Sequence, residues 1–377
     1  MRKFVLTGGP SGGKTSALKI LAAYLTKLGY TVFIVEETAS IILAQGGSPV
    51  KDGIVPFQLA IAKYQEEAEN AVEALALSNN AVNPIMLLDR GILDNKAYCD
   101  ASTWIEVLTQ FKPHQAPHVT EQQLYQRYEH VIHLQTAARI NKYNKDNNPN
   151  RYETAEEAII RDDHTIRAWL PHHGLKIVPN FPEYEGKKDA LLTLINQALG
   201  LSPNLEIEKK FLVPLTGQES IAEHLNHADI IYEIEQQYIG TATKQLRLRK
   251  AEAQYPKYPK AFNKTHYYLT SKTDSKDPTV REEVETEISE ATYNQLSDPL
   301  NKPLKKTRYV TVDFGQKVEV DVIPNIAGYP NPLVLMELEI NHAAQSLTLP
   351  VTLQHAVDVT ADKAYNNFQL WKRLNGQ

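Results

Sequence analysis

The feature that most constrains the fold lies at residues 8–15, where the chain reads GGPSGGKT. It fits the spacing G-x-x-x-x-G-K-[ST], follows a short apolar run at 4–6 and opens into a helical pattern at 16–21. Glycines let successive backbone N–H groups curve around phosphate oxygens, and the helix that follows directs its positive end at them. A glycine-rich turn of another purpose can share these letters, but the strand before it and the helix after it favour a phosphate loop.

We therefore expect this loop to bind ATP or GTP, with Lys14 balancing charge on the outer phosphates and Thr15 holding Mg²⁺. The expected nucleotide-binding residues are Gly8, Gly9, Pro10, Ser11, Gly12, Gly13, Lys14, Thr15 and Ser16.

Length and composition set the remaining bounds. A chain of 377 residues exceeds what one hydrophobic core usually serves, so two domains are expected. The net charge of -5 argues against a basic footprint for nucleic acid over the whole molecule, and the single cysteine, Cys99, excludes an intrachain disulfide. The start at Met1 leaves no room for a signal peptide, and no apolar run reaches membrane-spanning length. We expect a cytoplasmic protein without a transmembrane segment, for which peripheral membrane contact stays open.

The first 200 residues alternate short apolar runs with longer amphipathic segments, a pattern typical of an α/β domain with parallel strands and helices on both faces. In such a domain the ligands lie at the carboxyl ends of the strands. The expected strands are 3–7, 31–35, 84–88, 130–134 and 175–178.

Acidic and basic side chains follow two of these strands. Asp89 ends the run at 84–88, where a buried strand would deliver its carboxylate toward Mg²⁺ or toward an acceptor hydroxyl; the alternative is that it caps the turn into the next helix. Glu37 follows the second strand and either positions an acceptor or caps the helix that begins at Thr38. We predict Asp89 as the catalytic residue of this domain, assisted by Glu37 or Arg90.

Arginines and polar turn formers gather at 139–167, between the fourth and fifth expected strands. In a phosphotransferase this is where a lid closes over the phosphates and excludes water. Arg139, Arg151, Arg161 and Arg167 are its arginines. The alternative is a solvated loop whose arginines have no specific ligand.

A family resemblance rests on four elements of this half: GGPSGGKTS, Glu37-Thr38-Ala39, Phe57-Gln58 with Gln65 and Glu66, and Leu87-Leu88-Asp89-Arg90-Gly91. Together they resemble the AAA-type P-loop domain related to nucleoside and ribosylnicotinamide kinases, over most of residues 1–198. The resemblance implies nucleotide binding with Mg²⁺. It leaves the acceptor open.

The periodicity changes after Gly200. Eight strand-like runs follow, and in most of them charged residues alternate with apolar ones. One such strand is explained by a solvent-facing sheet, but eight in succession favour a closed antiparallel barrel with a charged lumen. A polyanion held by the bases and a divalent metal held by the acids would stabilise that lumen. The runs are 204–213, 230–239, 243–251, 264–273, 281–289, 304–312, 316–323 and 333–341.

This half resembles the CYTH domain of triphosphate tunnel metalloenzymes from about residue 204 to 370. The E-x-E-x-K signature is present as Glu206-Ile207-Glu208-Lys209-Lys210, and further matching elements follow in order to Asp362-Lys363-Ala364-Tyr365. The resemblance implies triphosphate-binding roles for Lys210, Arg247, Arg249, Lys272, Arg308 and Lys363. It implies that Mg²⁺ or Mn²⁺ is held by Glu206, Glu208, Glu283, Glu285, Asp321, Glu337 and Glu339, with Glu206, Glu208 and Lys210 also taking part in catalysis.

The order of the two halves, 1–200 and then 204–377, also resembles proteins of the TRPL translocation-defect family, which implies GTP and phosphoinositide binding. Two hypotheses follow for the whole chain. In the first it is an enzyme, a P-loop NTPase or small-molecule kinase fused to a metal-dependent triphosphatase. In the second it is a nucleotide-switched adaptor whose tunnel binds phosphoinositide or other polyphosphate head-groups without hydrolysis.

Overall fold

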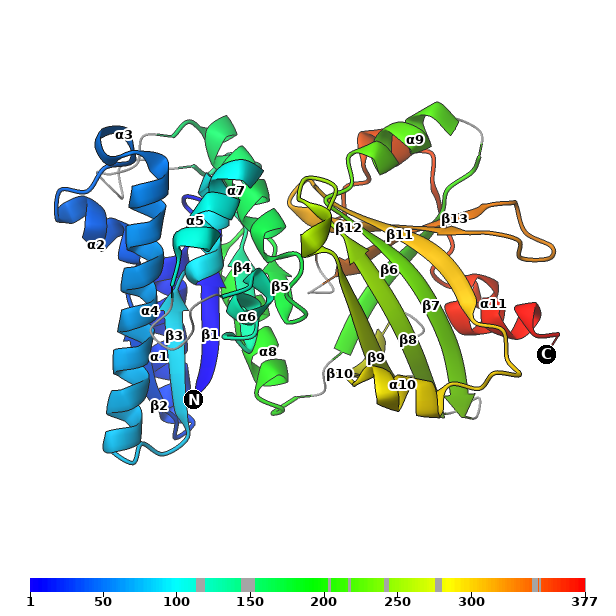
Figure 1. The fold of residues 1–377 in the computed structure, drawn as a ribbon, viewed down its shortest axis with the longest axis horizontal. Helices are drawn as coiled ribbons and strands as arrows, with labels where there is room; N and C mark the ends of the chain where they lie inside the picture. Colours follow the sequence, from blue (N-terminus) through cyan, green and yellow to red (C-terminus); the bar gives the residue numbers. More distant parts are fainter. Residues whose placement is uncertain are drawn as a thin grey trace. The chain divides into compact units, whose positions relative to one another are not determined.

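The computed structural model describes residues 1–112, 119–143, 153–202, 205–215, 218–240, 244–274, 280–340, 345 and 347–376. The chain divides into two compact units, Met1–Leu194 and Ile195–Gln377, each with its own sheet (Figure 1). No helix in the described part of the chain is long and apolar enough to cross a membrane.

The first unit is built on a five-stranded parallel sheet in the order β2-β3-β1-β4-β5. Its strands are β1 (Arg2–Thr7), β2 (Thr31–Val35), β3 (Pro84–Asp89), β4 (His130–Leu134) and β5 (Leu175–Val178). All five expected strands are confirmed, each to within one residue at either end. The central strand β1 is fully buried at Phe4, Val5 and Leu6, because the sheet is covered on both faces.

Helices connect these strands. They are α1 (Lys14–Lys27), α2 (Thr38–Ala44), α3 (Pro49–Asp52), α4 (Ile54–Ser78), η1 (Ile92–Tyr98), α5 (Ala101–Gln110), α6 (Glu121–Tyr125), η2 (Ala137–Ile140), α7 (Ala155–Trp169) and α8 (Tyr184–Ala198). The connection from β1 to β2, which contains α1, runs toward one edge of the sheet, and the connection from β2 to β3, which contains α4, runs back toward the other edge. Because both connections are right-handed, α1 and α4 lie on opposite faces of the sheet. The buried side of α4 includes polar residues, Gln58, Gln65, Glu66 and Glu69, which is unusual for a core-facing stripe.

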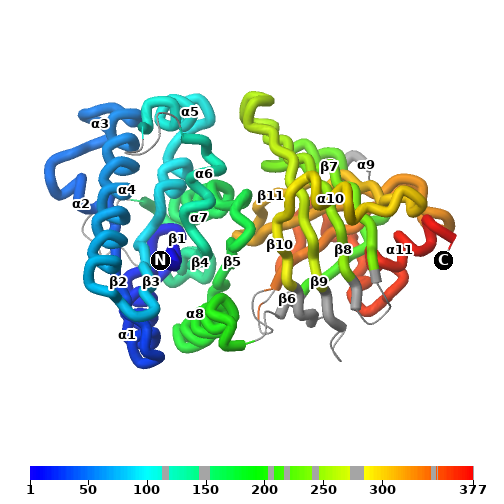
Figure 2. The backbone as a smooth tube through the Cα atoms, turned by 60° about the horizontal axis from the view of Figure 1, so that its bottom comes forward, coloured from blue at the N-terminus to red at the C-terminus, as the bar shows by residue number. Residues whose placement is uncertain are grey.

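The second unit is an antiparallel sheet in the order β10-β9-β8-β7-β11-β12-β13-β6-β14. Its strands are β6 (Leu205–Leu212), β7 (Ile230–Gly240), β8 (Lys244–Gln254), β9 (Lys264–Asp274), β10 (Val280–Glu287), β11 (Leu304–Asp313), β12 (Gln316–Ile323), β13 (Leu333–Ile340) and β14 (Val357–Asp358). β10 also pairs with β6 through three residue pairs, which joins the two ends of an eight-stranded ring of neighbours (Figure 2). All eight expected strands are present.

The two faces of this ring differ sharply. On the outer face, Val320, Met336 and Leu338 pack in one apolar cluster with Ile221 of α9 (Gln218–Asn226) and Leu353 of η4 (Val351–Leu353). Since side chains alternate along a strand, the charged positions between these residues face the enclosed side. The remaining helical elements are η3 (Lys260–Phe262), α10 (Glu290–Leu296), η5 (Lys363–Tyr365) and α11 (Asn367–Leu374).

One end of the enclosed face is apolar. Leu335 pairs with Asp321 in the β12–β13 ladder and so lies on the charged side of the sheet. It belongs to a cluster that includes Phe368 and Trp371 of α11. The C-terminal helix therefore covers this end of the enclosed face.

Candidate functional site

The phosphate loop connects β1 to α1 and is pressed against the end of β4. A β-carbon at Gly8 would lie 2.2 Å from the carbonyl oxygen of Leu134, and one at Gly12 would lie 2.5 Å from the same atom. Gly13 has φ +88°, in the left-handed region that disfavours other residues. The glycines of the motif are thus required by close packing and by backbone conformation.

Lys14 folds back over this loop. Its Nζ donates to the carbonyl oxygens of Gly8 at 3.0 Å and Gly9 at 3.2 Å. Burial lowers the pKa of Lys14, and Arg90 acts in the same direction, while Asp89 and Glu37 oppose them. Gly13 at the helix N-cap has no side chain to cap α1, so the amides of the first turn, including those of the exposed Thr15 and Ser16, are suited to an anion.

Asp162 of α7 stabilises the phosphate loop through hydrogen bonds. Its Oδ1 accepts from the Gly9 amide at 2.9 Å, from the Thr136 amide at 3.1 Å and from His133 Nε2 at 2.9 Å. Its Oδ2 accepts from Arg139 Nε at 3.0 Å. Burial alone would raise the pKa of Asp162, but His133, Arg139 and the Gly9 amide hold it at about 2. The Gly9 amide is thus already engaged by a carboxylate, a role that the sequence did not reveal.

Asp89 ends β3 with its side chain almost completely buried. It is 8% exposed, and its Oδ1 has no hydrogen-bond partner among the described residues. Burial raises the pKa of Asp89, with Lys14 opposing and Glu37 adding to the effect. Since buried polar atoms are nearly always paired, this oxygen is suited to a ligand, either a cation or an acceptor hydroxyl. Asp89 and the hydroxyl of Thr15 are the oxygen donors here that fit Mg²⁺.

Glu37 and Arg90 form an ion pair beside Asp89. The Arg90 Nε lies 2.6 Å from Glu37 Oε1, and Arg90 Nη1 donates to the Gly8 carbonyl oxygen at 3.2 Å. Burial would raise the pKa of Glu37, but Arg90 and Lys14 hold it at about 2. Glu37 occupies the N-cap of α2 without a side-chain capping bond, so its carboxylate orients Arg90 toward the loop.

Buried polar residues support the turn that carries Arg90. Gln65 donates to the Arg90 carbonyl oxygen at 3.3 Å and to Glu69 at 3.2 Å. Asp94 accepts from the Gly91 amide at 2.9 Å and from Arg90 Nη1 at 3.2 Å. These bonds explain the polar stripe of α4, because it faces the site and not only the core.

The segment 139–167, expected to be a lid, is described only in part. Residues 144–152, with Arg151, lie outside the described residues. Arg139 pairs with Asp162 and Asp163, and Arg161 lies 4.3 Å from the centroid of the Tyr98 ring and donates to the Ala97 carbonyl oxygen. These two arginines are therefore engaged by the body of the unit in this structure.

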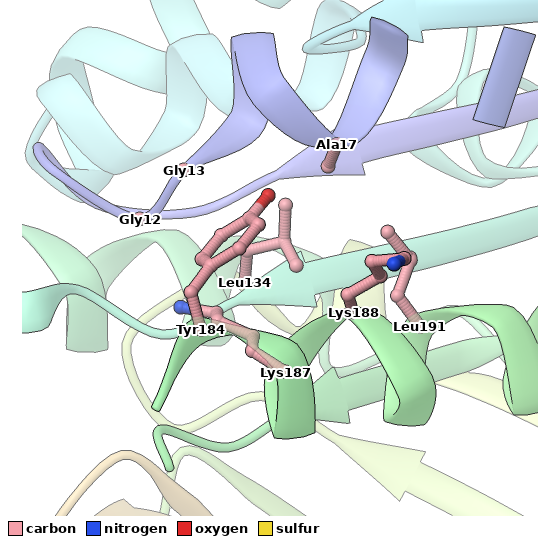
Figure 3. A pocket seen from close by; sticks show the side chains of 8 residues that line it. All are labelled: Gly12, Gly13, Ala17, Leu134, Tyr184, Lys187, Lys188 and Leu191. Carbon is pink, nitrogen blue, oxygen red and sulfur yellow. The ribbon is translucent and has the colours of Figure 1, made fainter. Parts of the chain in front are cut away.

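A hollow beside the loop lies between α1 and α8 (Figure 3). Tyr184 lies near Gly12 and Gly13, and the Nζ of Lys187, another residue of the lining, donates to the Gln135 carbonyl oxygen at 2.6 Å. Burial lowers the pKa of Lys187 to about 8. The hollow leaves essentially no room for a water molecule, so it is a seam between packed helices and not a ligand pocket.

The second unit carries a network of ion pairs on its enclosed face, here called the charged wall. Its members are Glu208, Lys210, Lys306, Arg308, Lys317, Glu319, Asp321, Glu337 and Glu339, from β6, β11, β12 and β13. Arg308 is its centre: Nε lies 2.7 Å from Asp321 Oδ1, and the guanidinium also pairs with Glu319 and Glu337. β12 lies between Arg308 and Glu337, so their contact requires both side chains on the enclosed face.

Acids and bases of the charged wall stabilise one another's charges. Lys210 Nζ lies 2.7 Å from Glu337 and 3.4 Å from Glu208. Burial would raise the pKa of Glu337, but Lys210 and Arg308 hold it well below its ordinary value. Lys306 is paired with Asp321, yet burial and Arg308 lower its pKa to about 8. The wall therefore presents ionised carboxylates and buried cations side by side.

Like charges also meet directly across the ladder. Glu319 is paired in register with Glu337, and Glu339 with Glu208. Such pairs are destabilising unless cations lie between them. Oxygen-rich carboxylate pairs are the donors that Mg²⁺ and Mn²⁺ prefer, so these residues fit a hard cation. Within the described ranges no group of three or more acidic, histidine or cysteine side chains is arranged to hold a metal, and the wall carboxylates are paired with bases.

A second, smaller set lies on β8, β9 and β10. Glu285 accepts from Arg247 at 3.0 Å, from Arg249 at 2.8 Å and from the Thr270 hydroxyl at 2.8 Å. Arg247 and Arg249, here called the arginine pair, thus share one carboxylate.

The sequence-predicted residues fall into three groups. The structure brings together Glu208, Lys210, Arg308, Asp321, Glu337 and Glu339 in the wall, and Arg247, Arg249 and Glu285 beside it. Lys363 lies exposed in η5, outside these ion pairs. The side chains of Glu206, Lys272 and Glu283 lie outside the described part. Lys306, Lys317 and Glu319 were not predicted as site residues, although alternation places them on the same face.

Comparison with known proteins agrees with this division. Residues 3–181 match the family model of an AAA domain, and residues 204–342 match that of the CYTH domain. Among curated proteins the comparison finds no match. Similar solved structures include the PH1819 protein of Pyrococcus horikoshii OT3, at 22% identity over 39% of this chain and 80% of that one with a TM-score of 0.24. The PH1012 protein of the same organism is 17% identical over 43% of this chain and 89% of that one, with a TM-score of 0.25. The chain thus consists of an N-terminal AAA domain followed by a C-terminal CYTH domain.

Proposed function

We propose that this chain is a two-domain phosphate-handling enzyme. Its first domain binds ATP or GTP and acts as an NTPase or a small-molecule kinase, and its second hydrolyses a triphosphate compound with Mg²⁺ or Mn²⁺. The single observation that carries the proposal is the charged wall, where carboxylates meet in like-charged pairs beside buried bases. Such a wall is suited to a polyphosphate and a metal cation bound together.

In the first domain, Lys14 exchanges its contacts with the loop carbonyls for the outer phosphates of the nucleotide. Mg²⁺, when bound through Thr15 and Asp89, supplies neutralisation of the charge on the transferred phosphoryl group. Asp89 also orients the acceptor hydroxyl or water, since its Oδ1 has no hydrogen-bond partner among the described residues. Glu37 holds Arg90 against the Gly8 carbonyl oxygen, where the guanidinium stabilises negative charge near the loop.

In the second domain, Arg308, Lys210 and the arginine pair bind phosphate oxygens in place of their present carboxylate partners. A divalent metal held by the freed carboxylates would supply Lewis-acid activation of a water molecule. In this hydrolysis a bond forms from the water oxygen to the terminal phosphorus, the bond from that phosphorus to the bridging oxygen breaks, the bridging oxygen leaves on the diphosphate, and a proton of the water is released to solvent. The bases stabilise the charge that develops on the bridging oxygen.

The proposal is tested by phosphate release from inorganic triphosphate, ATP and GTP in Mg²⁺ and in Mn²⁺, with the full chain. Glu337→Gln together with Glu339→Gln should reduce release from inorganic triphosphate by several orders of magnitude, because the metal donors are lost. The matched control is Glu233→Gln with Glu235→Gln, two glutamates with the same spacing on β7, where Glu235 pairs with Lys305 on the outer face.

The adaptor hypothesis predicts a different outcome. Should the wild-type chain release no phosphate from any of these compounds, yet bind phosphoinositide vesicles through Arg247 and Arg249, the hydrolase would be rejected in favour of a polyphosphate-binding adaptor. Equal rates for the wall variant and its outer-face control would also contradict the proposed site.

A further inference from the structure

Asp94 of η1 is a buried carboxylate that joins three elements around the phosphate loop. Its Oδ2 accepts from the Gly91 amide at 2.9 Å and from Trp169 Nε1 at 3.2 Å. Its Oδ1 accepts from the Thr7 hydroxyl and from Arg90 Nη1, the latter at 3.2 Å. Asp94 therefore connects the end of β1, the turn that follows β3 and the C-terminal end of α7.

The turn after β3 keeps a strained backbone. Arg90 has φ 74°, in the left-handed region that is unfavourable for any residue with a side chain. Its amide donates to the Leu6 carbonyl oxygen at 3.0 Å, and the next residue has no room for a side chain, because a β-carbon at Gly91 would lie 3.0 Å from the Trp169 ring. Strain of this kind is retained mostly at functional sites, so the direction of the Arg90 side chain is the feature that this turn fixes.

Two cations are directed at one atom of the loop. Arg90 Nη1 lies 3.2 Å from the Gly8 carbonyl oxygen, and Lys14 Nζ lies 3.0 Å from the same oxygen. The two charges repel each other, and Arg90 accordingly contributes to lowering the pKa of Lys14. A phosphate that bound both side chains would relieve this repulsion. Since Lys14 is expected to bind the outer phosphates, Arg90 lies where it would bind them too.

The two acid partners of Arg90 differ in their access to solvent. The side chain of Glu37 is 28% exposed and that of Asp94 is 3% exposed, compared with 12% for Arg90 itself. An incoming phosphate can therefore take the place of Glu37 on the guanidinium, whereas Asp94 stays enclosed by its other donors. Asp94 is thus the partner that keeps the direction of Arg90 when a ligand is bound.

We propose that Asp94 is a positioning residue: it holds the Arg90 guanidinium beside Lys14, so that Arg90 binds the outermost phosphate of a nucleoside triphosphate. A nucleoside diphosphate ends one phosphate earlier and lacks this contact. Asp94 thereby makes the loop prefer a triphosphate to a diphosphate. This inference rests on the proposed nucleotide binding of the first domain, and it names the residue that supplies the preference.

The test measures two affinities of the full chain by calorimetry with Mg²⁺: that for the non-hydrolysable imido analogue of ATP or GTP, whichever binds more tightly, and that for the corresponding diphosphate. All chains carry Arg247→Ala with Arg249→Ala to weaken binding in the second domain, and the same chain with Lys14→Ala is the blank. The measured quantity is the Kd of the diphosphate divided by the Kd of the triphosphate analogue. Asp94→Asn should lower this ratio about tenfold, because the charged hydrogen bond that holds Arg90 is lost.

Two comparisons separate positioning from general support of the loop. Arg90→Gln should lower the ratio as much as Asp94→Asn does, and the double variant should lower it no further, because Asp94 acts through Arg90. The matched control is Asp162→Asn, which also removes a buried carboxylate but acts on the Gly9 amide instead of on Arg90. It should weaken binding of both nucleotides by a similar factor and leave the ratio unchanged.

Equal weakening of both nucleotides by Asp94→Asn would overturn the inference and make Asp94 a residue of structural importance only. A further fall of the ratio in the double variant would also overturn it, and an unchanged ratio in Arg90→Gln would do so even if Asp94→Asn failed to fold. Should the chain before these substitutions bind both nucleotides with equal affinity, the nucleotide site would stand and the inference alone would be wrong. Should it bind neither nucleotide, the proposed function of the first domain would fail and the inference with it.

Discussion

Asp162→Asn is the most direct test of how the phosphate loop is held. The substitution keeps the volume of a side chain that is 0% exposed and removes its charge. One amide oxygen remains to accept from the Gly9 and Thr136 amides, but the new amide nitrogen replaces the oxygen that now accepts from Arg139. Arg139 would then face a donor instead of an acceptor, and the loop would lose part of its support.

The stability that the Asp162 charge contributes can be calculated from the shift of its pKa. A fall of the Asp162 pKa from its ordinary value of 3.8 to about 2 in the folded chain corresponds to about 2 kcal/mol of stability at pH 7. Because the folded-state pKa is depressed, this contribution is fully present above pH 4 and is lost as the pH falls toward 2, with about 1 kcal/mol gone by pH 3. Breaking a buried pair by removing one partner costs about 3–5 kcal/mol, so we expect a loss in that range for the variant at pH 7.

The assay is urea unfolding followed by tryptophan fluorescence in a Trp371→Phe background, which leaves the probes Trp104 and Trp169, both in the first unit. Asp163→Asn is the matched control: it is the next residue of α7 and also pairs with Arg139, but burial raises its pKa, so its charge contributes less. The reasoning is refuted if both variants lose the same stability, or if the deficit of Asp162→Asn is as large at pH 3 as at pH 7.

Three further predictions concern the ligands. Lys14→Ala should weaken nucleotide binding by calorimetry about 100-fold or more, since its ammonium group lies over the Gly8 and Gly9 carbonyls; undiminished affinity would reject the phosphate loop as the nucleotide site. Arg247→Ala with Arg249→Ala should weaken binding of every polyphosphate and reduce its salt dependence, and a loss confined to one compound would contradict a purely electrostatic role. In the second domain, inorganic triphosphate should raise the affinity for Mg²⁺ at least tenfold, and Mg²⁺ should raise that for triphosphate by the same factor; independent binding would show that the wall does not couple them.

The fold could be predicted almost completely from the sequence, for a physical reason. Strands buried on both faces are continuous apolar runs, as at Pro84–Asp89, and the antiparallel strands of the second unit alternate charged with apolar residues, as at Gln316–Ile323. Both patterns are formed by residues that are neighbours in the sequence, so they predict a strand even when the elements that pack against it are unknown. The end of β3 was predicted one residue too early because Asp89 is polar but still pairs with Leu6 in the sheet.

The site could be predicted only where it follows a local rule. The phosphate loop, Asp89 and the alternating charges of β11, β12 and β13 all do so. Asp162 does not, because its partner Gly9 lies 153 residues away and nothing around it in the sequence marks it as buried. Glu37 was predicted near the acceptor, but its engagement by Arg90 depends on a turn in which Arg90 has φ 74°. Such pairings are set by tertiary structure, which a single sequence does not display.

The phosphate loop and the charged wall provide positive charge for phosphate groups in different ways. At the phosphate loop the positive charge comes largely from backbone amides and a helix end, whose partial charges need no counter-ion, and Lys14 and Arg90 donate to the loop carbonyls. In the CYTH domain the charges are whole and enclosed, so each base must have an acid, as Arg308 has Asp321. A polyphosphate that took Arg308 would remove one of the two cations that pair with Asp321, and a cation that took Glu337 would remove one of the two acids that pair with Lys210. A polyphosphate alone or a metal cation alone would disturb the pairing of positive and negative charges in the charged wall. This is the physical reason to expect that the polyphosphate and the cation bind as one complex.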